Sequence, residues 1–228
     1  MTVWNGLYGL VRVLSDRNGG KALLYMHREA RRQVVLRQYE RPVPLYEYLK
    51  TVTHPNLPRV FDAFACGDAY FVIEEYIDGL SVAEVLENGL YTYRGARKVL
   101  AGVCDALSVL HAQGFVHRDI KPENVMIGKD GAVKLIDFNV SRAVSPDAPK
   151  DTAVLGTLGY APPEQLGLAQ SDARTDLYAL GVLLNVMLTG EHPSKKAVRG
   201  RAGRIVLKCT QIAPDARYRS AEDVKKAL

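Results

Sequence analysis

Short apolar runs separated by polar turns fill roughly the first 75 positions of the chain, a pattern typical of β-strands. The runs are rich in β-branched, aromatic and aliphatic residues, and the turns Asp-Arg-Asn-Gly-Gly, Arg-Glu-Ala-Arg and Cys-Gly-Asp separate them. One interruption has a helical character, because Pro44 suits a first helical turn and the residues after Val52 end it. We therefore predict a helix over about residues 44–52, and strands over residues 7–14, 22–27, 32–39 and 69–75.

From about residue 81 the spacing of apolar positions changes from two to three or four, which indicates helices. Residues 176–188 are apolar almost all round, as expected of a helix buried in the middle of a lobe. A hairpin is predicted from strands over residues 124–127 and 132–136, which are joined by a Gly-Lys-Asp-Gly loop. Ser220 has capping-box spacing and opens the last helix. A further helix over residues 94–111 has one apolar face, made of Val99, Leu100, Val103, Ala106, Leu107 and Leu110.

The change from strands to helices falls near residues 76–79, where a glycine follows an extended run. We predict an α+β protein with a small β-rich N-lobe over about residues 1–76 and a hinge over about residues 75–79. A larger helical C-lobe would cover about residues 80–228. A chain of 228 residues is long enough to bury the core that such an arrangement needs.

Composition limits the class of protein. Apolar residues make up 47% and charged residues 24%, so the chain is not broadly disordered. Basic residues gather over residues 195–204, but the net charge is only +5, and we favour a solvated loop with no nucleic-acid partner. Three isolated cysteines argue against a disulfide scaffold or a zinc site and for a reducing compartment. We find no membrane-spanning run and no signal peptide, and we expect a cytoplasmic protein; an anchor beyond Leu228 stays open.

The candidate chemistry lies in two short stretches. Residues 117–124 read His-Arg-Asp-Ile-Lys-Pro-Glu-Asn, and residues 137–139 read Asp-Phe-Asn. Phosphoryl transfer needs a carboxylate to take the proton of the attacking hydroxyl, oxygen ligands for Mg²⁺, and a cation near the transferred group. These two stretches contain all of these groups, so they predict a phosphotransferase.

The same residues resemble the catalytic motifs of a eukaryotic-like bacterial serine/threonine protein kinase, and the likeness covers essentially the whole chain. The resemblance implies a bilobal protein-kinase-like fold with the active site between the lobes. It implies transfer of the γ-phosphate of ATP, with Mg²⁺, to a Ser or Thr hydroxyl of a protein substrate. By this resemblance Asp119 accepts the hydroxyl proton, and Lys121 lies by the γ-phosphate. Asn124 and Asp137 would bind the metal.

Residues 156–164, Gly-Thr-Leu-Gly-Tyr-Ala-Pro-Pro-Glu, resemble the floor of the peptide site, although the family usually has Ala-Pro-Glu. The resemblance implies a buried ion pair between Glu164 and Arg217. It also implies that Asp176 accepts N–H bonds from the catalytic loop.

The resemblance assigns His117 to the apolar interior, packed with Phe138, and not to catalysis. Arg118 precedes the catalytic aspartate, an arrangement in which a phosphate on the segment before residue 157 can be captured by arginine. We therefore predict autophosphorylation at Thr152.

The nucleotide side departs from the family pattern. Only Gly20 remains of the glycine-rich loop, and an ordinary hairpin explains that turn equally well. Arg37 stands where the family has lysine, and its planar fork is not interchangeable with an ammonium. The expected position of the helix glutamate holds Leu45, and Glu47 lies two residues on, about 200° round the helix.

The partner of Arg37 stays open between Glu47 and Glu74, which occupies the position guarding the adenine pocket. By the resemblance, the backbone of two residues near the hinge, Glu75 and Ile77, bonds the adenine. The base would be sandwiched by Ala22, Val35 and Met126.

Two other functions compete with an active kinase. A pseudokinase that binds nucleotide or a partner without turnover is favoured by the poor glycine loop and by Arg37. The intact Asp119, Lys121, Asn124 and Asp137 argue against it. A small-molecule kinase of the antibiotic-phosphorylating type would share the catalytic loop but lacks the peptide-site segment found here.

Overall fold

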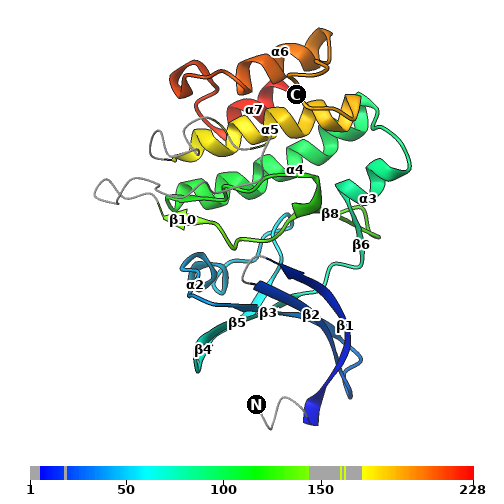
Figure 1. Ribbon diagram of the computed structural model, residues 1–228, viewed down its shortest axis with the longest axis vertical. Helices are drawn as coiled ribbons and strands as arrows, with labels where there is room; N and C mark the ends of the chain where they lie inside the picture. The colour runs from blue at the N-terminus through cyan, green and yellow to red at the C-terminus, as the bar shows by residue number, and fades with distance from the viewer. Residues whose placement is uncertain (1–5, 18–19, 144–159, 161, 163–170) are drawn as a thin grey trace.

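The computed structural model describes residues 6–17, 20–143, 160, 162 and 171–228. The N-terminal part is mostly β-sheet and the C-terminal part mostly helical, and the two are stacked along the long axis of the molecule (Figure 1). The predicted α+β class is confirmed.

Five antiparallel strands form the N-terminal sheet, in the order β1-β2-β3-β5-β4. All four predicted runs are strands, but β4 was missed. Its buried residues Val60 and Ala63 are three positions apart, and a shift in register between Val60 and Asp62 breaks the alternation that marks a strand. The strands are β1 (Tyr8–Arg17), β2 (Gly20–His27), β3 (Gln33–Tyr39), β4 (Val60–Cys66) and β5 (Ala69–Glu75).

A short helix, α2 (Leu45–Leu49), follows β3. Pro44, expected in the first helical turn, directly precedes the helix, and Lys50 follows its last residue, so the expected helix over residues 44–52 is too long. The residues that α2 buries are Leu45, Tyr46 and Leu49.

The helical part is built round two long helices, α4 (Tyr93–Ala112) and α5 (Ala173–Thr189). The six apolar residues predicted for one face of α4 are all buried, and α5 is buried almost all round. Both predictions are confirmed. Ser220 caps the last helix by accepting a hydrogen bond from the Asp223 N–H (3.1 Å), also as predicted. The other helices are α3 (Val82–Glu87), α6 (Gly200–Cys209) and α7 (Ala221–Ala227).

A second, three-stranded sheet lies beside the helices, in the order β6-β8-β9. Its β8–β9 hairpin confirms the predicted one, and the loop closes with a positive φ of 79° at Gly131, which glycine adopts without strain. Asn56 ties the loop before β4 to this sheet, because its amide donates to the Val133 carbonyl (2.8 Å). The predicted lobe boundary over residues 75–79 stays a prediction. The short strands are β6 (Gly79–Ser81), β7 (Phe115–Val116), β8 (Val125–Gly128), β9 (Val133–Leu135) and β10 (Arg142–Ala143).

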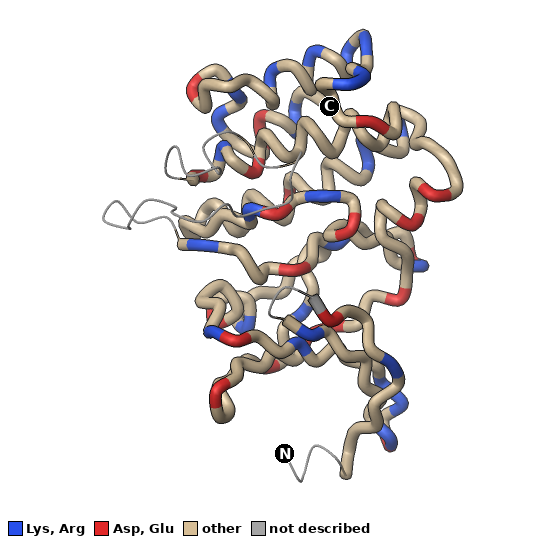
Figure 2. The backbone as a smooth tube through the Cα atoms, viewed as in Figure 1, with Lys and Arg blue, Asp and Glu red and all other residues tan. Residues whose placement is uncertain are grey.

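The basic residues of the segment 195–204 lie at the end of the molecule formed by α6 and the loop before it (Figure 2). Lys195, Lys196, Arg199 and Arg204 are exposed, as expected for a solvated surface. Among the residues described, no helix is both long and apolar enough to cross a membrane.

Candidate active site

A buried aspartate fixes the backbone of the loop that carries the candidate catalytic residues. Asp176, in the first turn of α5, is fully buried, and its two oxygens accept the N–H groups of His117 (2.9 Å) and Arg118 (2.8 Å). His111 of α4 adds a third contact of 2.7 Å. Burial alone would raise the pKa of Asp176, but the His111 side chain and the Arg118 N–H outweigh it and hold the pKa below its usual range. The role predicted for Asp176 agrees with this geometry.

Three polar side chains converge within the loop itself. The Asp119 carboxylate pairs with the Lys121 ammonium at 2.7 Å. The Asn124 amide nitrogen donates both to the Asp119 carboxylate (2.9 Å) and to the Asp119 backbone carbonyl (2.8 Å). Pro122 and Glu123 complete the tight turn, a 3₁₀ helix (Pro122–Asn124), that brings these groups together. Because its nitrogen is engaged, Asn124 can offer a cation only its carbonyl oxygen.

Asp137 is brought to the same loop by the residue before it. The Ile136 N–H donates to the Asn124 carbonyl (2.9 Å), and the Ile136 carbonyl contacts the His117 ring nitrogen at 3.1 Å. The chain then bends sharply, because Asp137 has a φ of 65°, a conformation that costs a residue with a side chain about 1–3 kcal/mol. Arg118 has a φ of 71°, so both ends of the site use strained backbone.

His117 and Phe138 form an apolar support below the polar groups. Both side chains are fully buried, and their ring centroids are 5.3 Å apart in an edge arrangement. Phe138 also meets the Tyr46 ring of α2 at 5.7 Å. The predicted packing of His117 with Phe138 is confirmed.

Arg37, the residue at the position of the family lysine, forms an ion pair with a residue of the same sheet. The Arg37 Nε on β3 contacts the Glu74 Oε1 on β5 at 2.5 Å, and the side chains are only 11% and 2% exposed. Burial opposes the charge on Arg37, but the Glu74 carboxylate raises the pKa of the guanidinium well above its ordinary value, so Arg37 is ionised. The Arg37 Nη1 lies 3.7 Å from the Asp137 Oδ1, which links the sheet to the catalytic loop.

The alternative partner of Arg37 is excluded by the structure. Glu47 of α2 accepts a hydrogen bond from the Tyr70 hydroxyl (3.0 Å) and pairs with Lys50 (2.6 Å). Its side chain is 57% exposed. The buried face of α2 passes through Leu45 and Tyr46, so Glu47 turns outward, as its offset along the helix suggested.

The residues expected round the base fall in two groups. Ala22 and Val35 lie on the buried face of the N-terminal sheet, because Ala22 is opposite Arg37 and Val35 is opposite Glu74. Met126 lies on β8 in the other sheet and Ile77 just after β5, and their contacts with a base stay predictions. The predicted bond between the Glu75 backbone and the adenine can be made more specific. The Glu75 N–H already donates to the Arg59 carbonyl (2.8 Å), which leaves the Glu75 carbonyl as the backbone group for a base.

The first two strands of the chain form a hairpin that contains Gly20. The ladder between β1 and β2 runs as far as the pair Arg17–Gly20. Only residues 18 and 19, which lie outside the described residues, separate the two strands. The choice between an ordinary hairpin and a phosphate-binding loop therefore stays open, and a contact of Gly20 with phosphate stays a prediction.

The donor set fits magnesium. Asp137 contributes a carboxylate and Asn124 an amide oxygen, both hard ligands of the kind Mg²⁺ prefers. No cluster of three or more His, Cys, Asp or Glu side chains suited to a metal occurs among the described residues.

A family model of the protein kinase domain matches residues 6–227 of the chain. The chain belongs to this family. Curated relatives include the serine/threonine-protein kinase PknB of Mycolicibacterium smegmatis, 33% identical over 208 residues that cover 78% of this chain and 33% of the relative. PknB of Mycobacterium tuberculosis is 37% identical over 150 residues, 62% of this chain and 24% of that protein. PrkC of Bacillus subtilis is 31% identical over 200 residues, 77% of this chain and 31% of that protein. The chain thus spans about a third or less of the length of these relatives.

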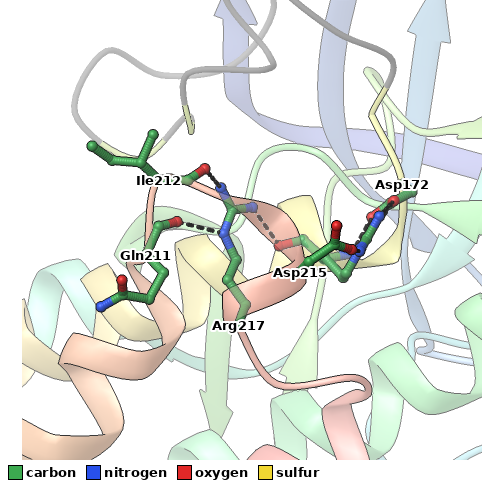
Figure 3. A network of polar contacts seen from close by, with 6 residues as sticks. Asp172, Gln211, Ile212, Asp215 and Arg217 are labelled. Atoms are coloured by element: carbon green, nitrogen blue, oxygen red, sulfur yellow. Dashed lines mark hydrogen bonds and ion pairs between the residues drawn. The ribbon is translucent and has the colours of Figure 1, made fainter.

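Within this kinase domain, Arg217 anchors the far end of the helical part (Figure 3). Its guanidinium donates to three backbone carbonyls: Gln211 (2.8 Å), Arg174 (3.0 Å) and Ile212 (3.1 Å). The side chain is 3% exposed and also lies over the Tyr178 ring. The expected partner, Glu164, lies outside the described residues, as do most of the peptide-site segment and Thr152. The ion pair and the autophosphorylation site stay predictions.

Sequence reasoning missed two features near these sites. The hydroxyls of Tyr39 and Tyr46 are hydrogen bonded at 2.8 Å in the buried space beside Arg37 and Glu74. Each tyrosine lies in its own apolar run, and nothing in the sequence indicated that the two hydroxyls would form a hydrogen bond. Arg174 also binds Asp172 and Asp215 at the start of α5 (Figure 3), and an Asp two residues before an Arg was a local signal that could have been noticed.

Proposed function

We propose that the chain is an ATP- and Mg²⁺-dependent serine/threonine protein kinase. One observation carries the proposal: the Asp119 carboxylate is held by Lys121 at 2.7 Å and by Asn124 at 2.9 Å, in a loop fixed from below by Asp176. Membership of the protein kinase domain family and the names of the bacterial relatives support it.

Asp119 takes the proton of the attacking Ser or Thr hydroxyl. The Asn124 amide holds its carboxylate in one orientation, so little reorganisation is needed as the proton moves. The Lys121 ammonium lies beside that carboxylate and can balance the charge of the transferred phosphoryl group.

Asn124 and Asp137 would hold Mg²⁺ through oxygen atoms. When bound, this ion would neutralise charge on the nucleotide phosphates. The Asn124 nitrogen keeps its bond to Asp119, so one side chain serves both the metal and the base. Arg37 supplies the cation for the phosphates from the sheet side, 3.7 Å from Asp137.

The adenine would lie against Ala22 and Val35 on one side and Met126 on the other. The Glu75 carbonyl and the Ile77 backbone would bond its edge, and Gly20 would lie near the phosphates. The support is the position of Ala22 and Val35 on the buried sheet face beside Arg37.

Transfer of labelled phosphate from γ-³²P-ATP tests the proposal. The purified chain should label itself or a Ser/Thr-containing protein such as casein when Mg²⁺ is present, and Asp119→Asn should not. Acid hydrolysis should release phosphoserine or phosphothreonine. Binding of ADP·Mg²⁺ without any transfer would support the pseudokinase alternative in place of the kinase.

A further inference from the structure

We infer that Glu74 of β5 is the positioning residue for the nucleotide cation Arg37, and that α2 has no part in holding that cation. This inference rests on the proposed kinase function and deepens it. In the protein kinase template, the β3 cation pairs with a glutamate of the following helix, and the placement of that helix controls activity. Here a strand residue would replace the helix residue, which removes that control.

The geometry of the pair suits a positioning role. Glu74 contacts the Nε of Arg37 at 2.5 Å, along the side of the guanidinium. The two terminal nitrogens stay on the outer end of the fork, and one of them, Nη1, lies 3.7 Å from the Asp137 carboxylate. The guanidinium is therefore fixed at its base while its tip faces the group assigned to the metal.

The sheet holds both partners independently of α2. Val35 is opposite Glu74 and Arg37 is opposite Val72 in the β3–β5 ladder, so Arg37 and Glu74 are diagonal neighbours on one face. The backbone positions of both residues are thus set by the pairing of two neighbouring strands of the N-terminal sheet. A movement of α2 would leave the two side chains in place.

The α2 helix contributes to the hydrophobic core. Leu45, Tyr46 and Leu49 are all buried, and Tyr46 meets Phe138, so α2 packs as part of the core. Its one acidic residue, Glu47, is engaged by Tyr70 and Lys50 on the outer side. Glu47 is thus a matched control for Glu74: it has the same side chain, lies in the same part of the molecule and makes no contact with Arg37.

Steady-state kinetics of two glutamine variants tests the inference. Gln keeps the shape of Glu and an oxygen that can accept from Arg37, but removes the charge that holds the guanidinium. We expect Glu74→Gln to lower kcat/KM for ATP by about 100-fold, with KM for ATP raised. KM for the protein substrate should change by less than about twofold, a split that loss of folded protein would not produce. Glu47→Gln should leave all three parameters within about twofold of the wild type.

A double-mutant cycle tests whether Glu74 acts through Arg37. ADP·Mg²⁺ binding is measured by calorimetry for the wild type, Arg37→Met, Glu74→Leu and the double variant, whose apolar pair strands no buried charge. We expect Arg37→Met and the double variant to bind with the same affinity. Should Glu74→Gln not fold, Glu74→Asp keeps the charge and should retain part of the affinity for ATP.

The outcomes separate the inference from the function on which it rests. If wild type and Asp119→Asn both fail to transfer phosphate, and wild type binds no ADP·Mg²⁺, the kinase assignment and this inference fall together. If wild type is active but Glu47→Gln loses as much as Glu74→Gln, only the inference is overturned. Further loss of ADP affinity in the double variant beyond Arg37→Met would also overturn it.

Discussion

The catalytic loop and the β3–β5 strand pair hold charged groups in two different ways. The loop places Asp119, Lys121 and Asn124 within eight consecutive residues, and its backbone is held by a carboxylate from a distant helix. The strand pair holds Arg37 with one carboxylate from a neighbouring strand, 37 residues away in sequence. The loop has the residue types of the protein kinase motif at the expected spacing. The strand pair has a cation and a carboxylate, as the motif does, but from different residues.

The difference follows from what each region must do. A group that takes a proton has to be a carboxylate at one position relative to the attacking hydroxyl, so residue type and spacing are both fixed. A group that only holds a cation in place has to bring negative charge within a few ångströms, from whichever element can reach it. The strand pair can therefore change partners while the loop cannot.

The largest effect should come from the proton acceptor in the loop. Replacing Asp119 by Asn keeps the size of the side chain but removes the acceptor, so we expect kcat to fall about 10²–10⁴-fold. KM for ATP should change little, because Asp119 is not placed against the nucleotide. Initial-rate kinetics at saturating ATP measures this, and a melting temperature close to wild type shows that the fold survives. If Asp119→Asn keeps more than a third of the wild-type kcat, Asp119 is not the proton acceptor, and the loop does not differ from the strand pair in the way described.

The next effect concerns the aspartate beneath the loop. Asp176→Asn leaves one oxygen to accept from two backbone N–H groups, so one buried donor is stranded, and we expect a loss of about 3 kcal/mol in the free energy of unfolding. Urea denaturation at neutral pH measures it. Asp105→Asn is the matched control, because the Asp105–Lys225 pair is partly exposed and its loss should cost less than about 1 kcal/mol.

The contribution of Asp176 should also depend on pH. Its pKa is lowered in the folded state relative to about 3.9 in the unfolded chain, so the unfolded state binds the proton more readily. The stabilisation is therefore fully present above about pH 4 and is lost as the pH falls through the folded pKa. The difference in stability between wild type and Asp176→Asn should shrink as the pH is lowered from about pH 4 to about pH 2. A constant difference over that interval would show that the carboxylate charge is not what fixes the loop.

The sequence was sufficient for the loop and insufficient for the strand pair, for physical reasons. Residues 117–124 are contiguous, so their spacing already restricts the geometry. The partner of Arg37 depends on the rotation of α2 and on the register between β3 and β5, and neither is encoded locally. Glu47 and Glu74 could therefore not be separated before the structure placed Leu45 and Tyr46 on the buried face of α2.

The same reasoning explains β4, the missed strand. Phe61 and Phe64 on it remain more than a third exposed, while the small Ala63 is buried, so its apolar pattern does not report the buried face. The long helices were predicted because the apolar residues of α4 recur at a helical spacing and those of α5 lie almost all round the helix.

The smallest effect should come from the neutral pair beside Arg37 and Glu74. Burial raises the pKa of Tyr39 and of Tyr46, so both hydroxyls are uncharged at neutral pH, and they bond to each other at 2.8 Å. Tyr46→Phe leaves the buried Tyr39 hydroxyl without this bond and should cost about 1–2 kcal/mol. The double variant Tyr39→Phe/Tyr46→Phe removes both polar groups and should be at least as stable as Tyr46→Phe alone.

Denaturant midpoints at constant m-value measure both effects in this pair. Tyr46→Phe should lower the free energy of unfolding by about 1 kcal/mol, and removing one partner of the charged Arg37–Glu74 contact should lower it more. That order would mean that charge contributes more than packing to the stability of this side of the site. If the double variant is instead less stable than Tyr46→Phe, the Tyr39 hydroxyl must be stabilised by a group other than Tyr46. Arg37 acts electrostatically on the Tyr39 hydroxyl, so the contacts that hold the nucleotide cation would then include Tyr39 of β3, and α2 would still have no part in them.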